Sequence, residues 1–433
     1  MRRTSLGVGF LATMTMAGGC ASRGGPGIKT SKEISQTPSP VLASLCAEGL
    51  PTQGMWKSDP LIVDFNGDGH ADLAALPRLG GGPRVWLGDG TGSWRESSTG
   101  LAYGQRSCGG GLDSGDINGD GFPDLVVADH CQGIFVYLGD GTGGWKMVTR
   151  GLEPSDLPVR QGRERMYTGV EDLAVADFDG DGYPDIVAGG SDEGGINVYY
   201  GDGTGSNWTR DATGLPSTKW SNRVVAADVN GDNRPDIVAS YAPGPRVWLN
   251  NGDRSWREAS KNLPSPMVQG LYSGIGVGDI NKDGRIDFVT ANWVDGPEVY
   301  LQQSDGSWTK MPDVFPEMEG GSTGAALGDI DGDGNLDIVA AGRLKPTGGV
   351  VRGVFLLLGD GTGAFRYVAN SRLPSTGLFA TPGVTISDIN GDDLGDIAVG
   401  SGLIVESSGK PLVPVVEQRL LVWCMRRPNS PAP

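Results

Sequence analysis

The chain has 433 residues, of which 73 are Gly, and it carries a formal net charge of −17 at pH 7. Such acidity disfavours nucleic acid as a partner, because like charges repel. An unpatterned chain this rich in Gly and acidic residues would be disordered, but here the acidic residues recur at a regular spacing, which indicates a folded repeat.

The N-terminus has the organisation of an export signal. Two arginines precede an apolar run at residues 6–16, which is too short to span a bilayer. Residues 17–20, Ala-Gly-Gly-Cys, resemble the end of a bacterial lipoprotein signal, in which small residues precede the Cys that is lipidated. We therefore expect lipidation of Cys20. The alternative is an ordinary secretory signal that is cut near Ala21.

The lipoprotein resemblance implies a signal peptide over residues 1–19 and a lipidated, flexible tether over residues 20–40. Ala21 and Ser22 follow the Cys where an Asp would retain a lipoprotein at the inner membrane. By that rule for bacterial lipoproteins, we expect the protein to be anchored in the outer membrane. The alternative is a secreted or periplasmic protein. Beyond the signal, the sequence has no stretch apolar enough to cross a membrane.

Asp177–Asp185 shows the motif on which the rest of the chain is built. Asp stands at positions 1, 3, 5 and 9 of this stretch, and Gly182 stands at position 6. Four hard oxygen donors this close together would repel one another without a cation. Calcium suits them, because it takes about six to eight oxygens in flexible geometry. The glycine permits the sharp turn.

The motif recurs in seven nine-residue loops, numbered here 1 to 7: residues 64–72, 116–124, 177–185, 228–236, 279–287, 329–337 and 388–396. Their expected calcium ligands are 23 Asp and five Asn: Asp64, Asn66, Asp68, Asp72, Asp116, Asn118, Asp120, Asp124, Asp177, Asp179, Asp181, Asp185, Asp228, Asn230, Asp232, Asp236, Asp279, Asn281, Asp283, Asp287, Asp329, Asp331, Asp333, Asp337, Asp388, Asn390, Asp392 and Asp396. These loops account for the acidity of the chain, which therefore indicates metal sites and not a surface for basic partners.

Two features separate these loops from EF-hands. Position 12 is never Glu, and the flanking segments have the composition of strands and not of helices. Loops 4 and 7 carry Asn233 and Asp393 at position 6 in place of Gly. Both residue types tolerate the left-handed conformation, so we expect weaker metal sites there.

Successive loops begin 52, 61, 51, 51, 50 and 59 residues apart, a period that indicates a repeat architecture. Each unit has a small-residue strand before its loop and a β-rich run after it, such as residues 275–278 and 236–240. A third strand such as Val85–Leu87 follows, and then a Gly-Asp turn and an aromatic residue, such as Trp94, that opens a fourth. Four strands in each of seven units predict an all-β, seven-bladed β-propeller, in which we expect the repeated aromatic residues to pack between blades.

With these loops and strands, residues 41–425 resemble the FG-GAP/VCBS repeat family. Its calcium-loop propellers also occur in the head of integrin alpha subunits and in some lectins. The resemblance implies Ca²⁺ as a structural cofactor, up to one ion per blade, whose binding is coupled to folding.

The last unit lacks a fourth strand, and the chain ends in a tail at residues 426–433 that we expect to be disordered. We expect residues 41–46 to complete the last blade and to remove its open edge. This pairing would bring Cys46 beside Cys424, about three residues out of register, so that a disulfide and two buried free thiols both remain open.

Cys108 and Cys131 flank loop 2 almost symmetrically. If loop 2 joins two antiparallel strands, these residues face one another, and a disulfide between them is geometrically plausible. Here too, buried free thiols are the alternative.

The irregular insertions fall in connections on the face opposite the metal loops, and they carry basic residues: Arg160, Arg163 and Arg165 between the second and third units, and Arg343, Lys345 and Arg352 in the sixth. Long loops on one face of a rigid scaffold are where binding usually occurs. We interpret this basic face as a site for an acidic glycan or a protein partner. Solvated insertions without a function are the alternative.

Support for catalysis is slight, because the sequence has two His, His70 and His130, and no nucleophile elbow, H-E-x-x-H motif or phosphate-binding loop. We therefore expect a monomeric, non-catalytic propeller at the cell surface that mediates adhesion or recognition of a protein or glycan partner. The alternatives are a calcium-dependent lectin and a polysaccharide lyase.

Overall fold

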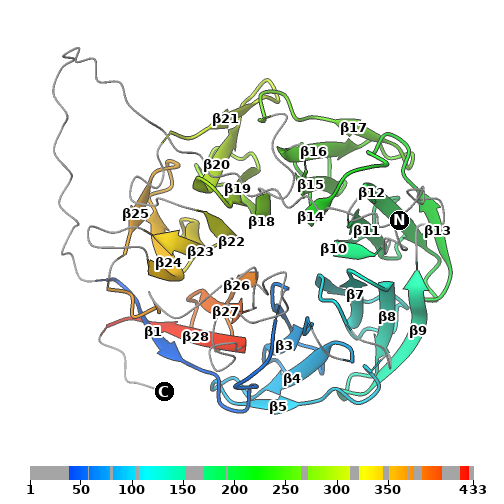
Figure 1. Cartoon of the computed structure of the whole chain (residues 1–433), viewed down its shortest axis with the longest axis horizontal. Helices are drawn as coiled ribbons and strands as arrows, with labels where there is room; N and C mark the ends of the chain where they lie inside the picture. The colour runs from blue at the N-terminus through cyan, green and yellow to red at the C-terminus, as the bar shows by residue number, and fades with distance from the viewer. Residues whose placement is uncertain are drawn as a thin grey trace, which may run out of the picture. The chain divides into compact units, whose positions relative to one another are not determined.

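The computed structural model describes residues 39–56, 58–78, 81–102, 107–152, 169–191, 194–242, 244–264, 272–312, 321–344, 351–368, 370–374, 383–401 and 420–428. In these residues the chain forms seven four-stranded antiparallel sheets, which are arranged as the blades of a β-propeller (Figure 1). The predicted fold class and blade number are therefore confirmed.

Blades 1 to 7 are given with their strands from the centre of the ring outward. Blade 1 is β2 (Leu61–Val63), β3 (Asp72–Ala75), β4 (Arg84–Gly88) and β5 (Trp94–Glu96), and blade 2 is β6 (Leu112–Gly115), β7 (Asp124–Asp129), β8 (Gly133–Gly139) and β9 (Trp145–Leu152). Blade 3 is β10 (Val170–Ala176), β11 (Asp185–Gly190), β12 (Ile196–Gly201) and β13 (Trp208–Asp211), and blade 4 is β14 (Ser221–Ala227), β15 (Asp236–Tyr241), β16 (Gly244–Asn250) and β17 (Trp256–Glu258). Blade 5 is β18 (Tyr272–Gly278), β19 (Asp287–Asn292), β20 (Gly296–Gln302) and β21 (Trp308–Lys310), and blade 6 is β22 (Ser322–Gly328), β23 (Asp337–Leu344), β24 (Val351–Gly359) and β25 (Phe365–Tyr367). Blade 7 is β26 (Gly383–Ser387), β27 (Asp396–Gly400), β28 (Leu420–Arg426) and β1 (Leu42–Leu45).

The composition of each strand follows from its place in the blade. Second strands are covered by a blade on each side, and every residue of β15 is buried, which explains their nearly continuous apolar runs. Innermost strands crowd around the axis and therefore need small residues. A Cβ at Gly274 in β18 would lie 2.5 Å from the backbone nitrogen of Ala325 in β22 of the next blade. The small residues before each loop are thus a packing requirement.

The hydrophobic core is divided into seven clusters, and each cluster fills the seam between two neighbouring blades. In the seam between blades 1 and 2, for example, Phe65 of loop 1 packs edge-to-face on Trp145, with ring centroids 5.2 Å apart. The indole nitrogen of Trp145 also donates a hydrogen bond to the carbonyl of Ser97 in blade 1, at 3.0 Å. The repeated aromatic residues therefore pack between blades, as predicted.

The ring is closed by β1, which pairs with β28 as the outer strand of blade 7. This confirms the predicted closure by the N-terminal segment. Ser44 lies opposite Cys424, and the backbone nitrogen of Cys46 donates to the carbonyl of Val422 at 2.9 Å. The offset is two residues instead of the three expected, and Cys46 and Cys424 form a disulfide. Of the two possibilities left open by the sequence, the disulfide is the one that the structure contains.

Replacing Cys46 and Cys424 together by Ser should destabilise the protein more than the same change at Cys108 and Cys131. The two disulfides span sequence separations of 378 and 23 residues. In the chain-entropy treatment such loops contribute about 6 and about 3 kcal/mol. Urea midpoints of the two double variants, measured in calcium buffer, test this ranking. Equal midpoints would show that ring closure does not depend on the Cys46–Cys424 bond.

Candidate metal centres

All seven loops connect the first and second strands of a blade, and the 28 predicted ligand residues lie in the described part of the chain. In every loop the Asp at position 1 accepts a hydrogen bond from the backbone nitrogen of position 6, at 2.7–3.0 Å. Position 6 in loops 4 and 7, Asn233 and Asp393, has φ of 63° and 62°. The prediction that both residues adopt the left-handed conformation is therefore confirmed.

The Asp at position 9 is completely buried in all seven loops. One carboxylate oxygen accepts the backbone nitrogen of position 2 at 2.8–3.0 Å. The other accepts a backbone nitrogen from the end of the third strand at 2.7–2.9 Å. This residue thus connects the loop to the third strand of its own blade, a role that the sequence analysis did not identify.

Burial raises the pKa of each position-9 carboxyl, and neighbouring Asp charges add to the effect while the two backbone donors oppose it. The pKa is raised to about 6 in loops 1, 2, 4 and 5 and to about 7 in loops 3, 6 and 7. A buried carboxylate with a raised pKa is costly to keep ionised. A cation bound in the loop would offset this cost.

Positions 2 and 7 of each loop are fixed by packing. The position-2 side chain is buried in the seam with the next blade, as with Phe178, whose ring centroid lies 5.5 Å from that of Trp256. In loops 1 to 4 and 6 the position-7 side chain lies against the turn between the third and fourth strands, whereas Leu394 of loop 7 is buried in the seam between blades 6 and 7. A Cβ at Gly203 would lie 2.4 Å from the ring of Tyr183. The loop conformation is therefore coupled both to its own blade and to its neighbour.

The residue at position 3 divides the loops into two classes. In loops 1, 2, 4, 5 and 7 it is Asn, whose amide nitrogen donates to the carboxylate of position 5 at 2.9–3.4 Å. In loops 3 and 6 it is Asp179 and Asp331, which have no amide to donate. Within the described residues, two groups of three Asp have carboxylate oxygens that all lie within 4.8 Å of one another, one group in loop 3 and one in loop 6.

The donors of loop 6 fit a hard cation. Asp329, Asp331 and Asp333 offer three convergent carboxylates. One oxygen of Asp331 is buried and accepts no hydrogen bond, and such a buried polar atom is costly to leave without a partner. Calcium binds through oxygen ligands of this kind. The residues present in loop 6 therefore match the chemistry expected from the sequence.

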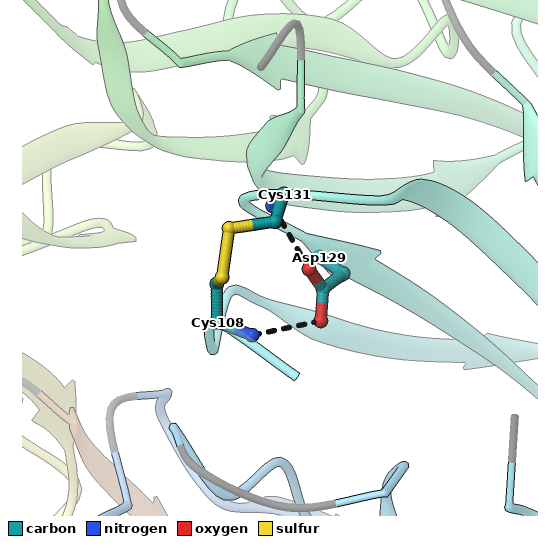
Figure 2. A group of neighbouring side chains, drawn as sticks. All are labelled: Cys108, Asp129 and Cys131. Atoms are coloured by element: carbon teal, nitrogen blue, oxygen red, sulfur yellow. Dashed lines mark hydrogen bonds between the residues drawn. A yellow bond between two sulfur atoms is a disulfide. The ribbon is translucent and has the colours of Figure 1, made fainter. Parts of the chain in front are cut away.

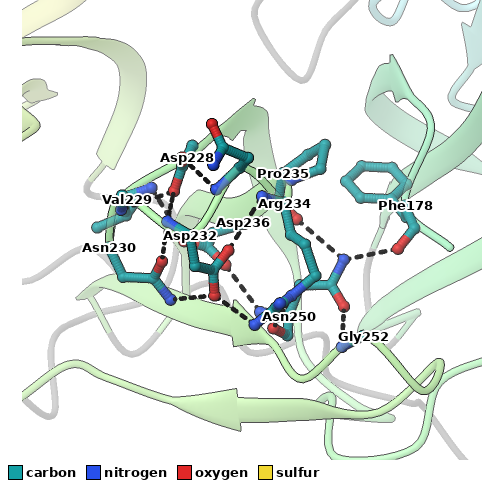
Figure 3. Close-up of polar contacts among 12 residues, drawn as sticks. Phe178, Asp228, Val229, Asn230, Asp232, Arg234, Pro235, Asp236, Asn250 and Gly252 are labelled. Atoms are coloured by element: carbon teal, nitrogen blue, oxygen red, sulfur yellow. Dashed lines mark hydrogen bonds and ion pairs between the residues drawn. The ribbon is translucent and has the colours of Figure 1, made fainter. Parts of the chain in front are cut away.

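Among the described residues, arginine side chains donate hydrogen bonds to the carboxylates of three loops. In loop 4 the guanidinium of Arg234, at position 7, donates to the carboxylate of Asp232, and its Nε donates to the carbonyl of Asn250 at 3.1 Å (Figure 3). Arg285 contacts Asp283 in loop 5 in the same way. These guanidinium groups partly neutralise the position-5 carboxylates.

In loop 3 the arginine comes from the neighbouring blade. Arg254, in the turn between β16 and β17, donates from Nε and Nη2 to one oxygen of Asp179 at 3.0 and 2.5 Å. Its guanidinium carbon lies 4.4 Å from the ring centroid of Tyr200. Arg254 has a φ of 61°, at a place where the corresponding turn of blade 1 has Gly92. Its unfavourable backbone conformation therefore accompanies a specific contact with a metal loop.

Several predicted site residues give different outcomes. Arg343 in β23 and Arg352 in β24 lie opposite one another in the backbone register of the sheet. The prediction that these two residues lie in a loop is therefore wrong, because β23 and β24 extend further than expected. Cys20 and, from the basic insertions, Arg160, Arg163, Arg165 and Lys345 lie outside the described residues. Where the chain is described, it has no helix long and apolar enough to cross a membrane.

Cys108 and Cys131 form the predicted disulfide, and they enclose the carboxylate of Asp129 (Figure 2). Asp129 accepts the backbone nitrogens of Cys108 and Cys131 at 3.2 and 2.9 Å. These three residues could be mistaken for a metal site by proximity alone. Because the sulfurs are bonded to one another and the carboxylate is hydrogen-bonded, the group joins two connections on the face opposite the loops.

The innermost strand of blade 4 contributes an ion pair that the sequence analysis missed, in which Arg223 is buried and the Asp59 side chain is 42% exposed. The Nε of Arg223, in β14, donates to Asp59, just before β2, at 3.1 Å. Blades 4 and 1 are not neighbours, so this pair joins distant parts of the ring. Burial raises the pKa of the nearby Asp172 carboxyl to about 7, with Arg223 opposing the shift and Asp59 adding to it. β14 has a β-bulge between Ser221 and Arg223, at the residue that forms this ion pair.

We expect chelation to lower the melting temperature more at pH 8 than at pH 5. The position-9 carboxyls have a usual pKa of 3.8, which the metal-free fold raises to about 6 or 7. The metal-free folded state therefore holds more protons than the unfolded state, and its stability falls as pH rises through this window. Thermal melts in EDTA and in CaCl₂ at three pH values measure the gap, which is the melting temperature in CaCl₂ minus the melting temperature in EDTA. The exposed Asp202 is the control, since Asp202→Asn should leave the gap unchanged. A gap that is absent, or constant with pH, would contradict this account.

We expect Arg254→Gly to strengthen calcium binding by loop 3. Glycine suits the positive φ, and removing the guanidinium takes a positive charge away from four carboxylates, which favours the ion by about fivefold. Titration calorimetry of wild type and variant measures this change. Arg257→Gln, which removes an exposed charge on β17, is the matched control. Weaker calcium binding by Arg254→Gly would show that the arginine supports the site.

Parts of the chain are similar to a known repeat family and to known proteins. The FG-GAP-like repeat family matches residues 64–127, 116–188, 177–239, 228–290 and 279–340, which together span more than half of the chain. Human phosphatidylinositol-glycan-specific phospholipase D is 29% identical over 225 residues, 45% of this chain and 23% of that protein. Integrin alpha-7 of Rattus norvegicus is 29% identical over 142 residues, 30% of this chain and 12% of that protein. The match thus spans less than a quarter of either relative.

Among solved structures, BBS1N in complex with ARL6DN, soaked with lead, aligns with 90% of this chain and 99% of that chain, at a TM-score of 0.55 and 12% identity. This similarity concerns the fold alone. The five consecutive family matches coincide with the described loops and blades. The chain belongs to the FG-GAP-like repeat family.

Proposed function

We propose that this protein is a calcium-stabilised, non-catalytic propeller that recognises a protein or glycan partner at the cell surface, attached by lipid to Cys20 in the outer membrane of a bacterium. The observation that carries the proposal is that the metal loops and the other connections lie at opposite ends of the strands. All seven loops lie between the first and second strands and are bonded into the blades. The connections between second and third strands and between blades lie at the other end of the strands.

Calcium would be held by carboxylate and amide oxygens at positions 1, 3, 5 and 9 of each loop. A bound cation would neutralise clustered carboxylates, including the buried one at position 9, and so stabilise the fold. Loop 6 has four carboxylates and would bind most strongly, because in loop 3 the guanidinium of Arg254 offsets one of the four carboxylates. In loops 1, 2, 4, 5 and 7 the Asn at position 3 supplies one carboxylate fewer.

Recognition of a partner is supported by the relatives. An integrin alpha subunit shares the repeats, and the propeller-like structure of BBS1N was solved as a complex with another protein, ARL6DN. The match to phosphatidylinositol-glycan-specific phospholipase D covers 23% of that enzyme, so its activity is not proposed for this chain. A rigid scaffold with variable connections on one face suits binding.

We expect calcium-dependent binding to a glycan or a defined cell-surface protein. A chain with Cys20→Ala, which cannot be lipidated there, would be applied to a glycan array and to an array of purified exported proteins, in CaCl₂ and in EDTA. Retention in calcium and loss in EDTA would support the proposal. Depolymerisation of an acidic polysaccharide by the same sample, followed by the ultraviolet absorbance of unsaturated sugar ends, would favour the lyase alternative.

A further inference from the structure

Blade 6 departs from the other blades just after its fourth strand. In blades 1, 3 and 4 a Leu follows the opening Trp of that strand by seven residues: Trp94 and Leu101, Trp208 and Leu215, Trp256 and Leu263. In blade 6 the separation from Phe365 to Leu373 is eight residues. The residue before this Leu has a positive φ in each of these four blades: Gly100, Gly214, Asn262 and Arg372, at 97°, 89°, 72° and 66°. Blade 6 therefore has one extra residue and an arginine where Gly or Asn is usual.

A pocket lies at this departure from the repeat. It has a volume of about 370 Å³ and is lined by Val354 and Phe355 of β24, Tyr367 and Val368, and residues 370–373. The rings of Phe355 and Tyr367 are tilted by 58°, with centroids 6.3 Å apart. Pockets that hold small ligands begin at about 300 Å³, so this one accommodates a single small ring with its substituents.

The rim of the pocket is held in place by the backbone. The carbonyl of Ser371 accepts a hydrogen bond from the nitrogen of Ala43 in β1 at 2.8 Å, and the carbonyl of Pro374 accepts one from Val354 at 3.0 Å. The segment is thus tied both to the closing strand of blade 7 and to its own blade. The pocket is built into the structure, because both ends of its rim are bonded.

The polar side chains of the pocket favour an anion. Arg372 is exposed and forms no ion pair with the acidic residues that the structure describes. A positive φ is unfavourable for Arg, and a side chain held in such a conformation suggests a function. Asn370, also exposed, adds an amide. A guanidinium, an amide and the partly exposed ring of Tyr367 together match a carboxylate carried by a ring with an apolar face.

We propose that this pocket binds an acidic sugar residue of a glycan, with Arg372 pairing to the sugar carboxylate. The inference rests on the proposed recognition function and specifies its ligand class. The net charge of −17 opposes the approach of any polyanion, so an acidic glycan requires a local cation such as Arg372. At physiological salt the general repulsion is screened beyond about 8 Å, whereas a contact pair in the pocket is not.

The test uses the calcium-loaded full chain with Cys20→Ala, sodium D-glucuronate as the probe and methyl glucoside as its neutral counterpart. Arg372→Gly is the informative variant, because glycine suits the positive φ and is the residue found at this place in blades 1 and 3. Arg366→Gln is the matched control, since Arg366 is an exposed arginine on β25 that does not line the pocket. Saturation-transfer difference NMR titrations measure the affinities.

We expect saturable binding of glucuronate, at least about tenfold weaker binding in Arg372→Gly, and no change in Arg366→Gln. The neutral glucoside should bind at least about tenfold more weakly than glucuronate. Equal affinity of wild type and Arg372→Gly, equal affinity for both sugars, or no saturable binding to the folded wild type would each overturn the inference.

These outcomes are separable from those of the proposed function. Array binding to acidic glycans that persists in Arg372→Gly would overturn the assignment of the pocket and leave surface recognition standing. Glucuronate binding that depends on Arg372, in a protein that retains no glycan and no protein partner on the arrays, would support the pocket and overturn the proposed function.

Discussion

The carboxylate at position 9 of each loop is the interaction on which the propeller depends. It is inaccessible to solvent and accepts one backbone hydrogen bond from within the loop and another from the end of the third strand. The second strand, which begins with this Asp, is therefore held at this carboxylate both to the loop that follows the first strand and to the end of the third strand. Because the loop donor is the nitrogen of position 2, the same carboxylate also orients the position-2 side chain toward the next blade. The position-9 Asp thus fixes both the arrangement of strands within a blade and the packing of the position-2 side chain in the seam with the next blade.

Seams take the place of a central core in this protein. Each hydrophobic cluster is shared by two blades, so that no blade buries its apolar faces alone. A ring of this kind is stable when it is closed, since an open ring would expose the clusters on both sides of blade 7. Closure combines the pairing of β1 with β28 and the Cys46–Cys424 disulfide. Covalent and hydrogen-bonded closure act in the same blade because β1 and β28, which pair there, carry or adjoin the two cysteines.

The periodic features of the fold could be predicted from the sequence, and the features specific to one blade could not. Loops, blade number and the closing strand follow from a motif that is repeated seven times and from one missing strand. The predicted register beside Cys46 differs from the observed one by one residue, because β1 and β28 are far apart in the sequence and no turn joins them. Arg254 and Arg223 escaped notice because their partners, Asp179 and Asp59, are far away in the sequence. Only folding brings these pairs together.

The seven loops share a backbone but differ in the charge that surrounds them. Loop 3 has four carboxylates and receives Arg254, so its local charge matches that of loops 1 and 2, which have three carboxylates each. Loop 6 also has four carboxylates, one of them with a buried oxygen that lacks a partner. Loops 4 and 5 have three carboxylates and an arginine of their own. A repeat that conserves its geometry can thus vary its electrostatics loop by loop, because position 3, position 7 and the neighbouring turn point away from the hydrogen bonds that hold the blade.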